Sequence, residues 1–396
     1  MASSEPLVCP RPPTEKPEFT IGTLRKAIPA HCFKRSTWRS FSYLLVDLVA
    51  VAALYFASTF IDSVAPAWLA YGALWPLYWF WQGAVCTGIW VIAHECGHGA
   101  FSDYTWVNDT VGFVMHSALL VPYYSWKHSH RRHHSNTGSL AKDEVFVPTQ
   151  DEGEAALFKY TWYRAGFLAV QSLLGWPLYL FFNASGREYS RLANHFDPTS
   201  PIFSKRERPG IVLSDLGIAA VVYALYRAGL TLGWAWLVKS YVVPYLIVNF
   251  WLVTITFLQH THPNLPHYED EEWDWLRGAL ATVDRSYGIL DVFFHRIADT
   301  HVAHHLFSQI PHYHAQEVTE AIKPILGSYY SKDNRNIIKA LWQEIALCHF
   351  VSKEPATKAG VVWFQTATKE HLVPATDAAA AGFDADAAAA KGIKAE

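Results

Sequence analysis

Four long apolar segments constrain the fold of this chain more than any other feature. They lie at about 43–62, 68–92, 211–232 and 236–259, and Trp and Tyr are frequent at their ends, as in the interfacial belts of membrane proteins. A helix of about 20 apolar residues spans a bilayer. Only 17% of residues are charged, against about 25% in average soluble chains. The sequence therefore predicts an all-α membrane protein with about four transmembrane helices, rather than helices buried in a large soluble core.

Histidine is the residue type that points to chemistry. Sixteen of the 20 histidines fall in the windows 94–134, 260–267 and 295–314. These windows contain H-E-C-G-H at 94–98, H-R-R-H-H at 130–134 and H-V-A-H-H at 301–305. Residues three and four apart lie on neighbouring faces of a helix, so each motif can direct its imidazoles to a metal. Their repeated spacing makes the three motifs together a strong metal-site signal.

The eight histidines of these motifs are more than one ion needs, because zinc takes about four ligands. Two metal ions are therefore the economical interpretation. Imidazole suits iron, zinc, copper and nickel, and redox-active iron adds chemistry that side chains cannot perform.

A shared site requires all motifs on one membrane face, so an even number of spans must separate them. We therefore expect the segments 111–124 and 161–182, which are short or interrupted by Pro and Gly, to lie in the interface. Basic residues between Lys26 and Arg39, and Arg131 with Arg132, favour the cytosolic side for the N-terminus and for a helical cap that holds the histidines. Residues 1–40 contain no apolar run, so we expect no signal peptide.

Two other classes of protein fit part of this pattern. His94-Glu95-Cys96-Gly97-His98 matches H-E-x-x-H, the motif of zinc proteases, in which the glutamate, here Glu95, is the general base. Some proteases with this motif act within the membrane. A membrane metal transporter would account for the number of histidines. Neither hypothesis explains three motifs of fixed spacing. The net charge of −3 gives no reason to expect nucleic-acid binding, and five scattered cysteines do not indicate a disulfide framework.

The sequence resembles the membrane fatty-acid desaturase family, in particular its plant-type microsomal Δ12 (ω-6) oleate desaturases. The resemblance extends from about residue 19 to 351 and is densest in AHECGHGAFSDYTWVNDTVG (93–112), VPYYSWKHSHRRHHSNTGSLAKDEVFVP (121–148), FLQHTHPNLPHY (257–268) and DTHVAHHLFSQIPHYHA (299–315). Related ω-3/Δ15 desaturases, hydroxylases, epoxygenases and acetylenases share the motifs. Gly99 departs from the His common in ω-6 enzymes and matches the ω-3 subgroup.

The resemblance implies a non-heme di-iron site with nine nitrogen ligands: His94, His98, His130, His133, His134, His260, His301, His304 and His305. His262 is the alternative to His260. Ligating imidazoles usually donate their second N–H to a carboxylate or carbonyl, and Glu95, Asp143 and Asp299 are candidates for that role.

The implied reaction is O2-dependent conversion of oleoyl to linoleoyl chains on membrane phospholipid. The sequence contains no haem, flavin or nucleotide motif of its own, so the resemblance implies cytochrome b5, with its NADH-dependent reductase, as electron donor. It also implies residence in the endoplasmic reticulum membrane with the site facing the cytosol, and an apolar channel for the acyl chain. We expect a cytosolic arm over 1–42, the desaturase domain over 43–350 and a tail over 351–396, of low complexity at its end.

Overall fold

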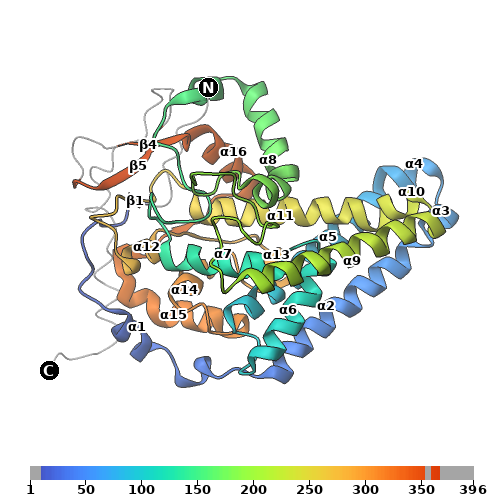
Figure 1. Cartoon of the computed structure of the whole chain (residues 1–396), viewed down its shortest axis with the longest axis horizontal. Coiled ribbons are helices and arrows are strands. Elements are labelled where there is room, and N and C mark those ends of the chain that lie inside the picture. Colours follow the sequence, from blue (N-terminus) through green and yellow to red (C-terminus); the bar gives the residue numbers. More distant parts are fainter. Residues whose placement is uncertain (1–9, 353–357, 366–396) are drawn as a thin grey trace, which may run out of the picture.

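The computed structural model describes residues 10–352 and 358–365 and is mostly helical (Figure 1). Its α-helices are α1 (Ile21–Ala27), α2 (Thr37–Ser58), α3 (Ile61–Val64), α4 (Ala67–Leu69), α5 (Trp75–His98), α6 (Thr105–Ala118), α7 (Tyr123–Asn136), α8 (Thr161–Phe182), α9 (Arg208–Leu232), α10 (Trp234–Leu237), α11 (Val243–His260), α12 (Trp275–Leu280), α13 (Leu290–Phe293), α14 (His301–Leu306), α15 (Ala315–Leu326) and α16 (Ile337–Leu347). Shorter helical turns are η1 (Ala30–Phe33), η2 (Ala70–Leu74), η3 (Gly153–Lys159), η4 (Val238–Val242), η5 (His312–His314) and η6 (Gly327–Tyr329). The strands are β1 (His267–Tyr268), β2 (Asp284–Arg285), β3 (Lys332–Asp333), β4 (Phe350–Ser352) and β5 (Val361–Gln365).

The long helices α2, α5, α9 and α11 form an elongated bundle, and the shorter elements gather at one end of it (Figure 1). Helix α5 packs against both α2 and α11 and is buried along most of its length. The outer helices are instead exposed: only 11% of the apolar stretch of α9 is buried. Exposed apolar faces of this length are expected where helices contact lipid. The bundle is therefore the membrane part of the chain, and the remaining elements form its cap.

Four helical stretches are long and apolar enough to cross a membrane: Thr37–Val64, Thr161–Phe182, Arg208–Leu232 and Trp234–His260. Three of them coincide with predicted spans. The fourth predicted span, 68–92, lies in a continuous helical stretch from Ala67 to His98 that is rich in aromatic residues.

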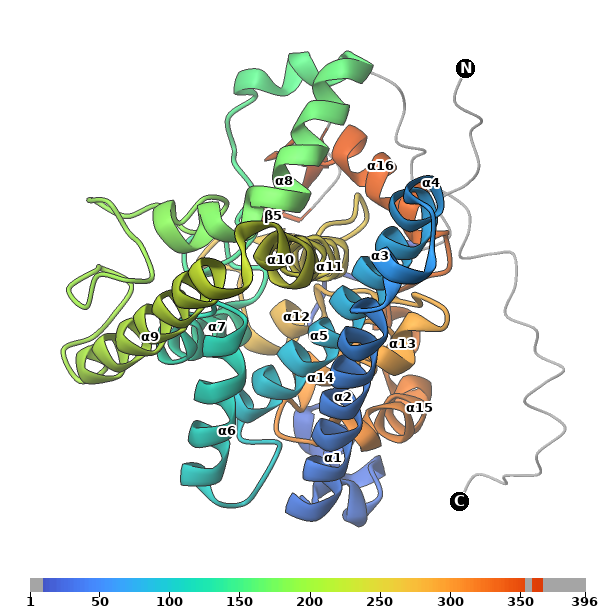
Figure 2. The ribbon, with the colours of Figure 1, turned by 90° about the vertical axis from the view of Figure 1, so that its right-hand side faces the viewer.

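Helix α8 has the length and composition of a span, although the sequence predicts an interfacial position for it. It runs across the direction of α11 in two perpendicular views (Figures 1 and 2). This orientation favours the interfacial placement, which stays a prediction. The segment 111–124 is not one continuous helix, because α6 ends at Ala118 and α7 begins at Tyr123.

Helices α5 and α11 each end at a histidine of the predicted metal site. Gly99 terminates α5 with a left-handed backbone (φ 72°), and the Ala100 amide donates a hydrogen bond to the Glu95 carbonyl. Glycine adopts this conformation without strain, so α5 stops directly after His98. Helix α11 ends at His260, because Thr261 is extended. Both helices therefore present histidines at the same end of the bundle.

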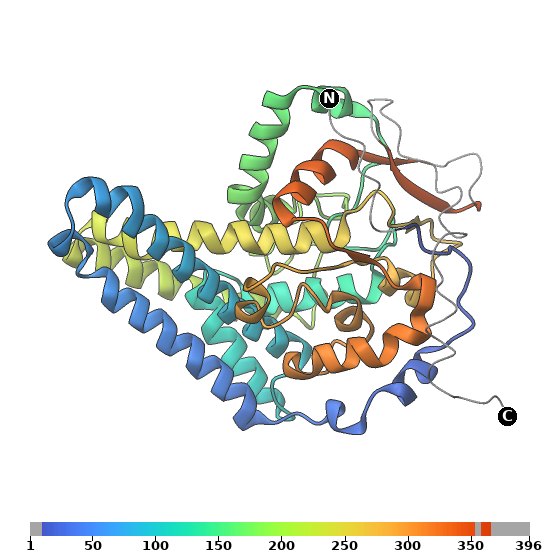
Figure 3. The same ribbon diagram turned by 180° about the vertical axis from the view of Figure 1, so that it is seen from behind.

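The cap is built on two apolar cores. One lies between α5, α8, α11 and α16, and the other joins α1, α12, α14 and α15. Figure 3 shows the ribbon of the cap from behind. A three-stranded sheet of order β1-β5-β4 closes the cap. Its strand β5 is almost entirely buried, although it lies beyond the expected start of the tail at residue 351. The predicted low-complexity end lies outside the described residues.

Candidate metal centre

Four helix ends bring the predicted histidines together. His94 and His98 lie in the last turns of α5, and His260 is the last residue of α11. The second motif lies on α7 and the third occupies α14. All nine rings predicted as ligands converge into two adjoining sets, which we call the first group and the second group.

The first group contains five histidines, His94, His98, His130, His134 and His304, and their ligand nitrogens all lie within 4.8 Å of one another. The Nε2 atom of His130 is 2.9 Å from that of His94, 3.1 Å from that of His98 and 3.1 Å from that of His134. Three helices therefore contribute imidazoles to one small volume.

The second group contains His133, His260, His301 and His305. The Nε2 atom of His260 lies 3.2 Å from that of His133 and 3.0 Å from that of His301, and the His301 and His305 Nε2 atoms are 3.1 Å apart. The two groups adjoin, since the His134 and His305 rings stack with centroids 4.1 Å apart.

Each H-x-x-H-H motif serves both groups. On α7, His130 and His134 belong to the first group and His133 to the second; on α14, His301 and His305 belong to the second and His304 to the first. The two histidines four residues apart project into one group, and the histidine three residues after the first, on a neighbouring face of the helix, projects into the other. The repeated motif is thus a helical bridge between two neighbouring sites.

The donor set fits metal ions. A transition metal lies about 2.0–2.1 Å from an imidazole nitrogen, so two ligands at a right angle would be about 3 Å apart, as observed here. The buried His304 Nε2 has no hydrogen-bond partner among the described residues. Burial lowers the pKa of His130, His134, His304 and His305 well below its usual range. These imidazoles are therefore neutral, which is the form that binds metal.

The three carboxylates expected to accept hydrogen bonds from ligating histidines differ in their contacts. Asp143 accepts a 2.6 Å hydrogen bond from His133 Nδ1. A Glu95 oxygen lies 3.3 Å from His94 Nδ1 and 3.8 Å from His304 Nδ1. Asp299 forms an ion pair with Arg296 at 3.0 Å instead. Asp143 is thus placed to orient His133, Glu95 lies close to His94 without accepting a hydrogen bond from its Nδ1, and Asp299 has a different partner.

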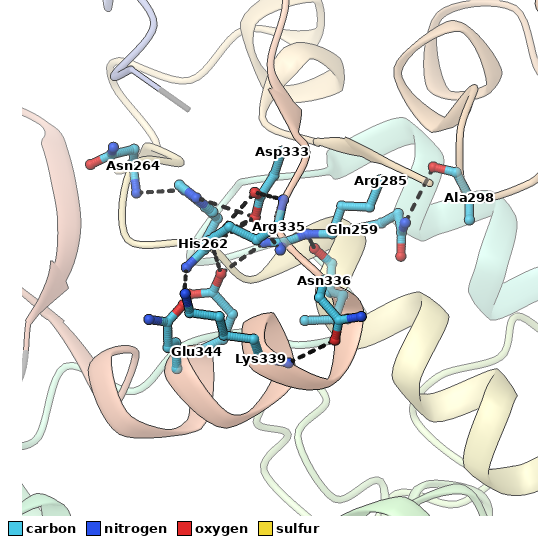
Figure 4. A network of polar contacts seen from close by, with 12 residues as sticks. Gln259, His262, Asn264, Arg285, Ala298, Asp333, Arg335, Asn336, Lys339 and Glu344 are labelled. Carbon is cyan, nitrogen blue, oxygen red and sulfur yellow. Dashed lines mark hydrogen bonds and ion pairs between the residues drawn. The ribbon is translucent and has the colours of Figure 1, made fainter. Parts of the chain in front are cut away.

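His262, the alternative to His260, lies in a buried ion network (Figure 4). Its Nδ1 accepts a 3.0 Å hydrogen bond from the Asn264 amide, and its Nε2 lies 3.9 Å from Asp333. Burial, and then Arg285 and Arg335, lower the pKa of His262 well below its usual range. His260 therefore lies among the other histidines predicted as ligands, whereas His262 lies in the ion network, and the identity of the ninth ligand stays a prediction.

Two tryptophans also belong to the site and were not predicted. The Trp90 ring stacks against His94, and the Trp126 ring stacks against His130 with centroids 4.4 Å apart. Each tryptophan precedes its histidine by four residues on the same helix. This spacing is the sequence signal that would have found them.

A largely apolar cavity of about 510 Å³ reaches the histidines from the side of α8, α11 and α16. His94, His130 and His133 from the two groups line one part of it, together with His260 and His301. Much of the remaining wall is aromatic and aliphatic, and includes Trp176, Phe146, Phe158, Phe257, Leu252 and Val253. Cavities of this size and lining suit apolar ligands.

A second, polar pocket of about 230 Å³ reaches the histidines from another direction. It is lined by His98, His130, His134 and His305, and by Lys127, Arg131, Ser308 and Gln309. The two groups thus lie between an apolar cavity and a polar pocket.

These features define a class: a helical membrane protein with a buried polyhistidine site, able to hold metal, beside an apolar cavity. Residues 66–335 match the family model for fatty acid desaturase, and residues 11–56 match a domain of unknown function, DUF3474. The chain belongs to the fatty acid desaturase family.

Its curated relatives are similar over nearly their whole length. It is 58% identical to Delta(12) fatty acid desaturase FAD2 of Calendula officinalis, covering 91% of this chain and 95% of the relative. It is 59% identical to Delta(12)-acyl-lipid-desaturase of Punica granatum, covering 90% and 92%. It is also 58% identical to Omega-6 fatty acid desaturase, endoplasmic reticulum, of Brassica juncea, covering 89% and 93%.

Proposed function

We propose that the chain is an acyl-lipid Δ12 (ω-6) desaturase that converts oleoyl to linoleoyl chains on membrane phospholipid. The observation that carries this proposal is the convergence of nine imidazoles against an apolar cavity. The Δ12 activity in the names of the relatives supports the position of the new double bond.

The nine histidines of the two groups would hold two iron ions, five imidazoles around one and four around the other. A mid-chain methylene has no acidic proton, so general acid–base catalysis has nothing to act on. The chemistry that bound iron would supply is O2-dependent removal of two hydrogen atoms from adjacent carbons, which yields a cis double bond and, with two electrons and two protons from outside, two waters.

The protein's own residues select and position the chain. The apolar walls of the cavity replace water around the methylenes, and the histidines from the two groups face the same space. Stacking of Trp126 on His130 and the hydrogen bond from His133 to Asp143 fix ring orientations. The acyl chain would therefore pass beside the metal centre in a restricted position.

We further propose that cytochrome b5 delivers electrons at the polar pocket. This pocket reaches His98, His130, His134 and His305 without crossing the apolar cavity, so electrons and substrate would approach from different directions. The sequence and the relative from Brassica juncea favour the endoplasmic reticulum membrane, with the cap on the cytosolic side.

Expression in a yeast that makes only monounsaturated fatty acids tests the proposal. We expect linoleate on membrane phospholipid, measured by fatty-acid profiling with oxygen supplied. An ω-3 product or a hydroxylated chain would replace the Δ12 assignment by another reaction of the family. No new fatty acid, with the protein present in the membrane, would contradict the proposal.

A further inference from the structure

A second cluster of metal-binding side chains lies outside the histidine centre. We call it the Cys32 cluster; its ligand atoms all lie within 4.8 Å of one another, and its members are His31, Cys32, His314 and Glu317. None of them belongs to the nine histidines described above. Two come from η1, near the N-terminus, and two come from the end of η5 and the first turn of α15.

The local structure explains how four donors meet. His31 and Cys32 are adjacent in the short turn η1. His314 is the residue before α15, and Glu317 lies three residues later in the first turn, so the two side chains share one face. Helices α1 and α15 pack together and hold the two segments side by side (Figures 1 and 3).

Glu317 is the centre of the contacts. Its Oε2 lies 2.8 Å from His31 Nε2 and 3.7 Å from His314 Nδ1, and the two imidazole rings are in edge contact with centroids 5.3 Å apart. An exposed His–Glu pair alone would contribute little to stability. The cluster differs from such a pair because a second imidazole and a thiol face the same carboxylate.

Cys32 is the buried member, with 0% of the residue exposed. Burial and then the neighbouring Glu317 carboxylate raise the pKa of Cys32 to about 11. A thiol directed toward a carboxylate gains only a weak hydrogen bond. A divalent cation in place of the thiol proton would satisfy sulfur, carboxylate and both imidazoles together.

We propose that the Cys32 cluster binds one zinc ion, which fastens the N-terminal segment to α15. One sulfur, two nitrogens and one oxygen form a four-ligand set of the kinds that zinc prefers. Thiolate and carboxylate together would carry two negative charges, which balance the charge of the ion. Helix α15 packs on α14, the helix of the third histidine motif, so the ion would also brace the cap over the metal centre.

Cobalt substitution tests the site on the full-length protein purified in detergent. The nine histidines offer no thiolate, so a near-ultraviolet thiolate-to-cobalt charge-transfer band would report a cysteine ligand, and its loss in Cys32→Ser would assign it to the Cys32 cluster. We expect this band in the wild-type protein, its loss in Cys32→Ser and its retention in Cys348→Ser, the matched control at another cysteine. Absence of the band in the wild type, or its persistence in Cys32→Ser, would overturn the proposal.

A second variant covers the chance that Cys32→Ser fails to fold. The His31 side chain is 55% exposed and is not part of the apolar core, so His31→Gln should leave the fold intact. We expect its zinc affinity, measured by competition with a chromophoric chelator, to fall at least about tenfold. Equal affinity in the two proteins would exclude His31 and the four-ligand site. Neither measurement depends on desaturation, so their failure leaves the proposed function untouched.

Discussion

His133 and His304 belong to different groups of the histidine centre, and both are buried. Replacing either by alanine removes one imidazole from a set whose members lie about 3 Å apart. We expect His133→Ala or His304→Ala to abolish linoleate formation and to lower the iron content, while the protein still inserts into the membrane. Fatty-acid profiling, iron analysis and membrane fractionation measure these three outcomes.

His312→Ala is the control for this prediction. His312 packs against Tyr43 and His295 and lies outside both groups. Its replacement should therefore reduce activity less than either ligand variant. An equal loss of iron in His312→Ala would show that the assignment of the nine ligands is wrong.

Asp143 provides a second test at the scale of the residue. Its oxygen accepts the His133 Nδ1 hydrogen bond and also bonds the Glu144 amide. Loss of such an outer-shell carboxylate costs about 10- to 100-fold in metal affinity. We therefore expect Asp143→Asn to bind iron about 10- to 100-fold more weakly, measured by iron titration. Asp299→Asn should bind iron as tightly as the wild type, because Asp299 pairs with Arg296. A normal affinity in Asp143→Asn would contradict the orienting role.

The sequence predicts which histidines lie at the metal centre, but not which of them belong to the first group and which to the second. Spacings of three and four are local, so the motifs on α7 and α14 could be identified directly. The assignment of His133 to one group and His304 to the other depends on how α7 and α14 pack. The choice between His260 and His262 likewise depends on Arg285 and Asp333, which are distant in the sequence and adjacent in the fold.

Among the structural elements, α16 depends on a buried ion network that the sequence does not reveal. Arg285 contacts Asp333 and lies 2.8 Å from Glu344 of α16, and its Nε donates a hydrogen bond to the Leu258 carbonyl in the last turn of α11. Arg335 bonds the same two carboxylates. Two cations and two anions are thereby balanced, so the network joins α16 to the helix that carries His260.

Glu344→Ala should destabilise this region strongly. The change leaves two buried guanidinium groups with one carboxylate, and breaking a buried ion pair costs about 3–5 kcal/mol. The matched control is Ile338→Ala, at an exposed position of the same helix. We expect a much lower unfolding midpoint in detergent for Glu344→Ala than for Ile338→Ala. Similar midpoints would show that the network does not hold α16.

Helix α8 offers a test of the cavity. Gly175 lines it, and a Cβ atom there would lie 3.5 Å from Val253, which is an ordinary contact. Alanine should therefore be accepted, whereas the longer leucine would project into the space between α8 and α11. Overpacking of this kind costs about 1–3 kcal/mol, so Gly175→Leu should weaken substrate binding about 5- to 150-fold.

Gly166→Leu is the control on the same helix, because a Cβ atom at Gly166 has no neighbour within 4 Å. Linoleate formation by Gly175→Ala and Gly166→Leu should stay close to wild type, with iron content unchanged in all three variants. Full activity in Gly175→Leu would mean that the acyl chain lies elsewhere. The sequence predicts an apolar channel but not this lining, since residues from α8, α11 and α16 meet only in the folded cap.

For the molecule as a whole, the α9–α10 turn and helix α14, which carries the third histidine motif, lie at opposite ends (Figure 1). If the cap faces the cytosol, the turn at Gly233 faces the lumen, where glycosylation occurs. The natural sequon at Asn108 is a poor reporter, because its side-chain amide is buried and bonds the Ser102 and Tyr104 carbonyls. A glycosylation sequon placed within a long Gly/Ser insertion would be accessible to the glycosylation enzyme at either end of the bundle, so it can report which end faces the lumen.

We expect the insertion after Gly233 to be glycosylated in microsomes and the same insertion after Gln150, an exposed cap residue, to remain unmodified. A gel shift removed by endoglycosidase measures both. The basic residues from Lys26 to Arg39 are the reason for expecting this orientation, because positive charges beside a span are usually retained on the cytosolic side. A glycan at the insertion after Gln150 and none at the insertion after Gly233 would show that the cap faces the lumen. Electrons would then have to arrive from the lumen, and cytosolic cytochrome b5 could not be the donor.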